Sequence, residues 1–180
     1  PHISTVNKAA AVANETRPVV PAGIPPGVAE TVLIAPYNDA DQTCEIIRRH
    51  RDDLAAVILD AQTQHIAPRP EFLDALRQCT RECDVLFILD EVLTGFRLAY
   101  GGAQSLNGVT PDITTFGKII GGGMPVGAFG GRRDIMALFD PSDGGAAITH
   151  SGTFNANPMT MVAGEVVYQD KGRWPEADAQ

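Results

Sequence analysis

Residues 85–91 read VLFILDE, five consecutive apolar residues followed by two carboxylates. An uninterrupted apolar run of this length is typical of a strand that is covered on both faces, as in a parallel sheet. Similar runs occupy residues 31–35 (TVLIA) and 55–59 (AAVIL), and weaker ones lie at residues 112–116 and 126–129. We expect each of these runs to form a strand of the same sheet.

Helical patterns alternate with the predicted strands. A helix capped by Asn38 or Asp39 follows the first of them, another helix begins at Pro70, and two more are expected over about 133–139 and 157–168. Strands that alternate with helices predict an α/β fold of three layers, built on a mostly parallel sheet.

Composition restricts the classes of function. The chain of 180 residues carries 14 Lys+Arg against 22 Asp+Glu, a formal net charge of −8, which argues against binding to nucleic acid or to an anionic membrane. No apolar run reaches the length of a transmembrane helix, and the first residues do not resemble a signal peptide. Cys44, Cys79 and Cys83 lack metal-ligand partners at a suitable spacing, so we expect reduced thiols, no metal site and a cytoplasmic protein.

Ligands of parallel α/β sheets bind at the carboxyl ends of the strands, where this chain places Asp60, Asp90 and Lys118. A lone aspartate at such a position is more often a helix cap or a metal ligand than a catalytic group. Lys118 stands between a predicted strand and three glycines, 121–123, although lysines normally occupy solvated faces. A partly buried amine there could act as a nucleophile that forms a Schiff base.

Two nucleotide-binding patterns can be tested against the same glycines. A P-loop fails because position 112 is Asp and Lys118 is followed by Ile119. The dinucleotide fingerprint fails because position 126 is Val where a glycine is required.

A second motif, SGTFNANP at residues 151–158, contains Thr153 beside a glycine. Its hydroxyl could donate to a phosphate, although such a residue is more often a simple turn or cap residue. His65 and His150 lack a second ligand at metal spacing, so both are interpreted as surface or hydrogen-bonded histidines. The pair at 132–133 is interpreted as the start of a helix, with a substrate carboxylate as the alternative partner.

Three segments together resemble one family: FILDEVLTGFRLAYGGAQ (87–104), GVTPDITTFGKIIGGGMPVGAFGGRRDIM (108–136) and SGTFNANPMTMVAG (151–164). They are similar to class III, fold-type I, pyridoxal-phosphate aminotransferases, and most similar to the glutamate-1-semialdehyde 2,1-aminomutase branch. The resemblance covers about residues 28–168, and its motifs occur in the order typical of the family.

The resemblance implies a role for each matching residue. Lys118 would form a Schiff base with pyridoxal 5′-phosphate, and Asp90 would pair with the pyridine nitrogen and keep it protonated. Val92 would pack on the ring of the cofactor. Thr153 would contact the cofactor phosphate from the neighbouring subunit, which implies a homodimer with a shared active site.

The chain departs from the family in several places. Asp60-Ala61 stands where the family usually has Glu-Pro, and the segments that should carry the phosphate-binding turn and the C-terminal domain are absent. We therefore expect a central fragment: an irregular segment over 1–30, part of the cofactor-binding large domain over 31–170, and an off-pattern tail over 171–180.

The sequence thus predicts an aminotransferase or aminomutase that acts on a small amino, oxo or semialdehyde substrate. One alternative is a truncated, non-catalytic fragment or dimerisation module of the same fold. Another is a pyridoxal-phosphate lyase or racemase, because one fold supports many reactions. The GGAQ run at 101–104 and the Gly-Lys-Ile-Ile-Gly-Gly-Gly loop favour the first interpretation by resemblance.

Overall fold

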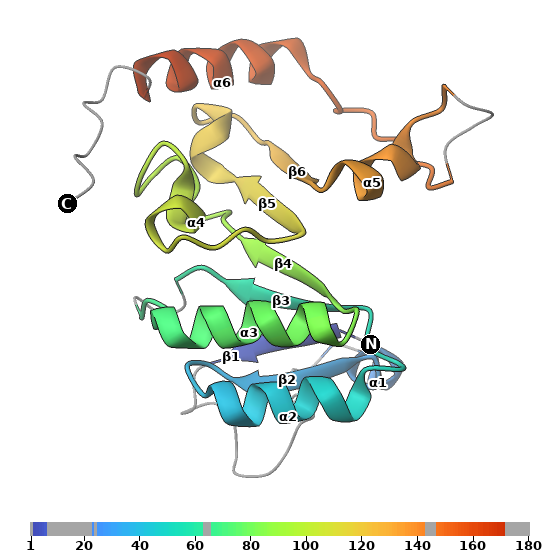
Figure 1. The fold of residues 1–180 in the computed structure, drawn as a ribbon. Helices are drawn as coiled ribbons and strands as arrows, with labels where there is room; N and C mark the ends of the chain where they lie inside the picture. Colours follow the sequence, from blue (N-terminus) through green and yellow to red (C-terminus); the bar gives the residue numbers. More distant parts are fainter. Residues whose placement is uncertain (1, 7–22, 24, 63–65, 143–146, 172–180) are drawn as a thin grey trace.

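A six-stranded sheet forms the centre of the molecule in the computed structural model, which describes residues 2–6, 23, 25–62, 66–142 and 147–171 (Figure 1). The strand order is β2-β1-β3-β4-β5-β6; β5 and β6 are antiparallel, and every other neighbouring pair is parallel. The strands are β1 His2–Val6, β2 Val32–Pro36, β3 Ala56–Asp60, β4 Leu86–Asp90, β5 Ile113–Gly117 and β6 Gly127–Gly131. The α/β class and the mostly parallel sheet predicted from the sequence are confirmed.

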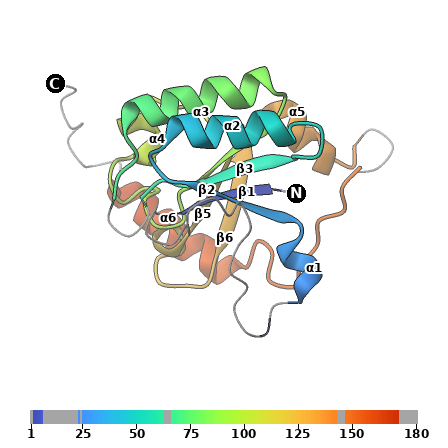
Figure 2. The same cartoon turned by 90° about the horizontal axis from the view of Figure 1, so that it is seen from below.

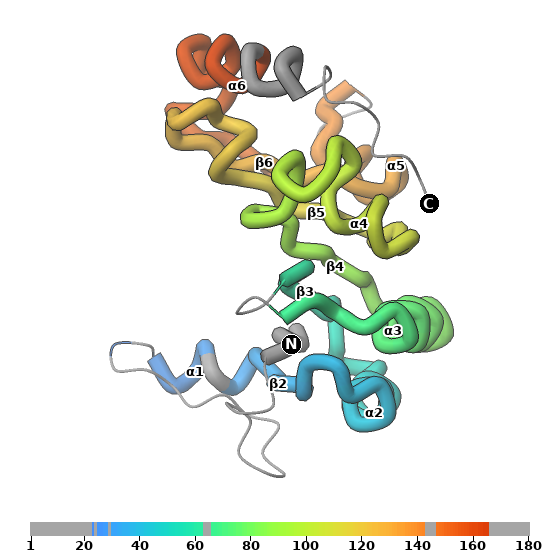
Figure 3. The backbone as a smooth tube through the Cα atoms, turned by 90° about the vertical axis from the view of Figure 1, so that its left-hand side faces the viewer, coloured from blue at the N-terminus to red at the C-terminus, as the bar shows by residue number. Residues whose placement is uncertain are grey.

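Helices lie on both sides of this sheet. The helices are α1 Pro26–Ala29, α2 Ala40–His50, α3 Pro70–Glu82, α4 Gly102–Leu106, α5 Arg133–Met136 and α6 Pro158–Lys171, with 3₁₀ turns η1 Lys118–Gly121 and η2 Ala137–Phe139. Figures 2 and 3 show α2 and α3 next to each other along one face, with α1 on the opposite side; α6 lies beyond β6 in Figure 1. The described helices include no candidate for a bilayer-spanning segment.

The helix starts follow their local sequences. The Asp39 side chain accepts a hydrogen bond from the Gln42 backbone N–H at 3.2 Å and so caps α2. Pro70 occupies the first turn of α3, where its missing N–H costs no helical hydrogen bond. Both starts agree with the predicted ones.

The main core lies between the sheet and the pair α2–α3. Its fully buried large side chains include Ile47, Leu59, Leu73, Leu76, Phe87 and Leu89. Burial alternates along β4, because Phe87 and Leu89 face this core while Leu86 and Ile88 are half-buried. The sequence predicted that both faces of β4 are covered. Only one face is fully buried, because α2 and α3 pack on the same side of the sheet.

The first thirty residues differ from expectation. They were expected to be irregular, but β1 forms there and is inserted between β2 and β3, where Ile3 pairs with Leu33 and Val57. The helix α1 also falls in this stretch. The strand was not predicted because its aliphatic residues, Ile3 and Val6, neither alternate nor form a continuous apolar run. Apart from Lys171, the tail over 171–180 lies outside the described residues.

Candidate active site at the carboxyl edge of the sheet

Three polar residues line up across the carboxyl ends of β3, β4 and β5. Asp60 is in register with Asp90, and Asp90 is in register with Thr115. Side chains at matching positions of parallel neighbours point to the same face, so these three form a row. Backbone bonds continue the pairing past the strands, from Ala61 N–H to Asp90 C=O (3.1 Å) and from Glu91 N–H to Thr115 C=O (3.0 Å).

The carboxylate of Asp90 is held in a fixed orientation. Its Oδ1 accepts hydrogen bonds from the Val92 backbone N–H at 2.9 Å and from the Thr115 hydroxyl at 3.1 Å. Sequence reasoning predicted Asp90 but missed Thr115. A hydroxyl residue on the strand that leads to Lys118 was the available signal, but its partner depends on a register that the sequence does not reveal.

Lys118 directly follows β5 and opens η1, where it is exposed rather than partly buried as the sequence suggested. Its backbone φ of 50° lies in the left-handed region, which is costly for a residue with a side chain and is often found at functional sites. A Cβ on the preceding Gly117 would lie 3.2 Å from Cγ1 of Val92, so the glycine lets Val92 lie against the backbone that presents the lysine. The structure thus brings Asp90, Val92 and Lys118 together.

The pKa of the half-buried Asp60 carboxyl depends on the other charges of this site. Burial raises its pKa, the backbone N–H of Gln62 lowers it, the negative charge of Asp90 raises it again, and Lys118 lowers it. Two carboxylates and one amine therefore share a small region at the edge of the sheet.

Thr153 lies elsewhere. It is exposed in the turn before α6, and the residues that follow it, 154–157, line a cavity together with β6, Met136 and Phe139. Within the described residues, no hydrogen bond joins Thr153 to Asp90 or Lys118. The described hydrogen bonds therefore do not link Thr153 to the other three predicted site residues.

Comparison with known proteins identifies the family. The model of the class-III aminotransferases matches residues 4–169, which is most of the chain. The chain belongs to the class-III aminotransferase family.

Individual relatives agree with this assignment. The glutamate-1-semialdehyde 2,1-aminomutase of Methanosarcina acetivorans is 49% identical over 148 residues, which are 81% of this chain and 34% of the relative. An omega-transaminase from Sphaerobacter thermophilus superposes with a TM-score of 0.80 at 47% identity, over 85% of this chain and 35% of its own. A transaminase with PLP bound superposes with a TM-score of 0.82 at 38% identity, over 94% and 43%. The chain spans about a third of the length of the curated relative.

Further residues considered in the sequence analysis are one histidine and three cysteines. His150 is exposed and lies edge-on to the rings of Phe129 and Phe139, with centroids 5.7 and 6.1 Å away. The cysteines form no disulfide; Cys44 and Cys79 are buried and Cys83 is half-buried. His65 lies outside the described residues.

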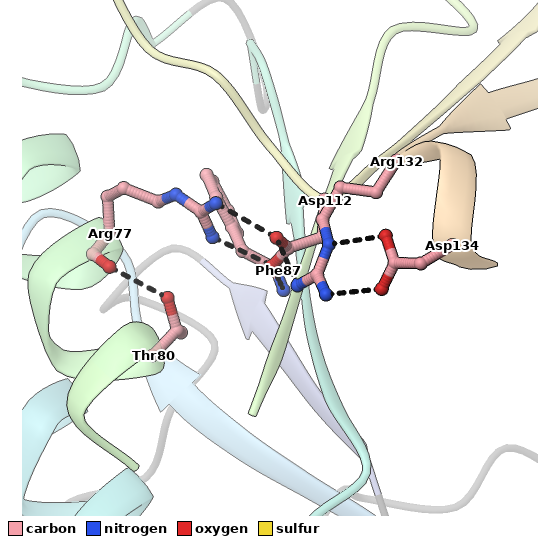
Figure 4. A network of polar contacts seen from close by, with 6 residues as sticks. All are labelled: Arg77, Thr80, Phe87, Asp112, Arg132 and Asp134. Atoms are coloured by element: carbon pink, nitrogen blue, oxygen red, sulfur yellow. Dashed lines mark hydrogen bonds and ion pairs between the residues drawn. The ribbon is translucent and has the colours of Figure 1, made fainter. Parts of the chain in front are cut away.

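The amino edge of β4 and β5 carries a different carboxylate, Asp112, which is almost fully buried (Figure 4). The Arg77 guanidinium donates to both of its oxygens at 2.7 and 2.9 Å, and the Phe87 backbone N–H and Arg132 add bonds of 2.8 and 3.2 Å. Burial alone would raise the pKa of Asp112, but these donors lower it to about 2. Arg132 lies at the N-cap position of α5, at the predicted helix start, without a capping side-chain hydrogen bond. Its ion pairs with Asp112 and Asp134 were not predicted.

Proposed function

We propose that the protein is a pyridoxal-phosphate-dependent aminotransferase or aminomutase, similar to glutamate-1-semialdehyde 2,1-aminomutase, that acts on a small amino, oxo or semialdehyde compound. The observation that carries this proposal is the convergence of Asp90, Val92 and Lys118 at the carboxyl ends of β4 and β5. The PLP-bound transaminase among the structural relatives and the aminomutase among the curated ones support it.

The groups at this edge fit the cofactor. Asp90 is oriented through Oδ1 by two neutral donors, so its carboxyl group is presented in a fixed direction from which it can accept a bond from a protonated pyridine nitrogen. Lys118 is exposed at the same edge, where its amine can reach an aldehyde. When bound, pyridoxal phosphate supplies that aldehyde for a Schiff base with the lysine and a ring that accepts electrons.

The chain's own residues would have separate roles. Asp90 would hold the proton of the pyridine nitrogen, and Val92 would pack against one face of the ring. Lys118 would carry a proton to and from the substrate Cα atom. Backbone hydrogen bonds hold the end of β4 and the turn η1, which present Asp90 and Lys118.

Thr153 is proposed to act at the active site of the neighbouring subunit. Its exposure agrees with a hydroxyl that binds the cofactor phosphate in the neighbouring subunit. The protein would then be a cytoplasmic homodimer with shared active sites, and residues 31–170 would belong to its cofactor-binding large domain.

Absorbance of the full-length, cofactor-loaded protein tests this function. A Schiff base with Lys118 gives a band at the blue edge of the visible spectrum, and Lys118→Ala should abolish it. The sequence contains only two other lysines, Lys8 and Lys171, so Lys171→Ala is the matched control and should keep the band. A band that persists in Lys118→Ala would refute the role of this lysine.

An amino-donor screen separates the finer alternatives. A transaminase should consume an added amino donor and accumulate its oxo product. An aminomutase should convert a semialdehyde substrate without any added donor. Turnover in neither assay, from a protein that carries the band, would contradict both.

A further inference from the structure

Glu91, which lies between two site residues in the sequence, is completely buried. Its Oε2 accepts hydrogen bonds from the Thr94 hydroxyl at 2.8 Å and from the Ala103 backbone N–H at 2.7 Å. Its Oε1 accepts from the Gln104 backbone N–H at 2.9 Å. A buried carboxylate is stable only when donors of this kind replace its water.

The backbone at Gly102 leaves the space that this carboxylate occupies. Gly102, at the start of α4, has a backbone φ of 70°, which residues with a side chain rarely adopt. A Cβ at this position would come within 2.5 Å of both Glu91 oxygens, so no side chain can replace the glycine without displacing the carboxylate. The glutamate and the glycine therefore act as one unit that ties the end of β4 to α4.

The same residue is connected to the site through its backbone. The Glu91 N–H donates to the Thr115 carbonyl at 3.0 Å, and the Gly95 N–H donates to the Glu91 carbonyl at 2.8 Å. The next N–H along the chain, that of Val92, is the one that orients the Asp90 carboxylate. Fixing Glu91 by both its side chain and its backbone therefore fixes the direction of the Val92 N–H.

We propose that Glu91 is a positioning residue that aligns the Asp90 carboxylate with the cofactor by anchoring the intervening peptide to α4. This inference rests on the proposed function, because it concerns the same site. Both carboxyl oxygens of Glu91 accept hydrogen bonds from Thr94 and α4, so its action passes through Val92 and Asp90.

Glu91→Gln is the sharpest test, because it preserves size and changes only the hydrogen-bonding pattern. An amide has one accepting oxygen, and its NH₂ group would face a backbone N–H of α4, so one anchor becomes a repulsion between two donors. Gly102→Ala should reproduce this effect from the opposite side by pushing the carboxylate away.

Three readouts apply to these variants in the full-length protein. The dissociation constant of pyridoxal phosphate should rise about tenfold, the effect of one misplaced charge-assisted bond. The pH at which the bound pyridine nitrogen loses its proton should move downward, because a misaligned Asp90 holds that proton less well. In the cofactor-free protein, the carboxyl carbon resonance of Asp90 should shift.

Asp112→Asn is the control for a merely structural effect. It removes a buried carboxylate of similar importance at the opposite edge of the same strands, and it should lower the unfolding temperature without changing these readouts. Glu91→Gln and Gly102→Ala variants that keep the wild-type Asp90 resonance and cofactor affinity would overturn the proposal. If the wild-type protein lacks the visible band assigned to Lys118, the proposed function fails. The Asp90 resonance of the cofactor-free protein then still tests whether Glu91 positions that carboxylate.

Discussion

The two ends of the β4–β5 pair carry buried or half-buried carboxylates in opposite settings. At the amino edge, Asp112 is satisfied by two guanidinium groups and a backbone N–H (Figure 4). At the carboxyl edge, Asp90 receives hydrogen bonds from two neutral donors, and within the described residues no arginine pairs with it. A carboxylate that already has cationic partners serves stability, whereas one held by neutral donors remains able to bind a cationic ligand group.

This contrast predicts that the two edges can be impaired separately. Substitutions at the carboxyl edge should reduce catalysis and leave unfolding nearly unchanged, and substitutions at the amino edge should do the reverse. The following experiments test the separation, beginning with the largest expected effect.

Asp90→Asn should reduce kcat/KM on the order of a thousandfold, because a neutral amide cannot keep the pyridine nitrogen protonated. Its thermal unfolding midpoint should stay close to that of the wild type, since the amide oxygen still accepts from Thr115 and Val92. Steady-state kinetics and calorimetry on the full-length protein measure both quantities. Exposed Asp74→Asn is the control; a fully active Asp90→Asn would contradict the account.

Asp112→Asn should lower the free energy of unfolding by about 3–5 kcal/mol, because it leaves the guanidinium of Arg77 without its carboxylate. Urea unfolding of wild type and variant measures the difference. Arg132→Met should cost less, since this arginine is half-exposed and its Asp112 contact is longer. Equal losses in the two variants would argue against the buried pair as the main source of stability.

Acid should weaken the amino edge selectively. The pKa of Asp112 is held at about 2, below its ordinary value of 3.8, so its stabilisation is present above pH 4 and is lost as the pH falls through 2. The shift corresponds to about 2 kcal/mol, which should appear as a fall in the urea midpoint between pH 4 and pH 2. Asp112→Asn should flatten this part of the profile, and an unchanged slope would contradict the assignment.

Asp60 should give the smallest effect. Burial and Asp90 raise its pKa, so the wild type loses a little stability as the pH rises through that value, and Asp60→Asn should remove the loss. We expect a gain of less than about 1 kcal/mol at pH 7, measured by urea unfolding. Asp60→Glu restores the acid usual in the family and is the matched control. A destabilised Asp60→Asn would contradict the account, because the hydrogen bond from the Gln62 N–H would then outweigh the cost of burying the charge.

The strand-end residues could be predicted from the sequence because a parallel sheet places all its carboxyl ends at one edge. Asp90 ends one strand and Lys118 directly follows another, and both strands can be recognised from their local sequence. The bonds that orient Asp90 were not readable, because the Thr115 contact depends on strand register and the Glu91–Gly102 unit on a loop conformation.

The amino edge was missed for a related reason. Four residues meet only after α3, β4, β5 and α5 have assembled: Arg77, Phe87, Asp112 and Arg132. Their local sequence does not reveal these contacts. The role of Thr153 remains a prediction, because it concerns a neighbouring subunit.

Reductive trapping tests the central claim most directly. The full-length protein is loaded with pyridoxal phosphate, reduced with borohydride, digested and mapped by mass spectrometry. The account predicts a phosphopyridoxyl group on Lys118 and none on Lys8 or Lys171. A modification on another lysine, or an unmodified Lys118 in protein that shows turnover, would contradict it.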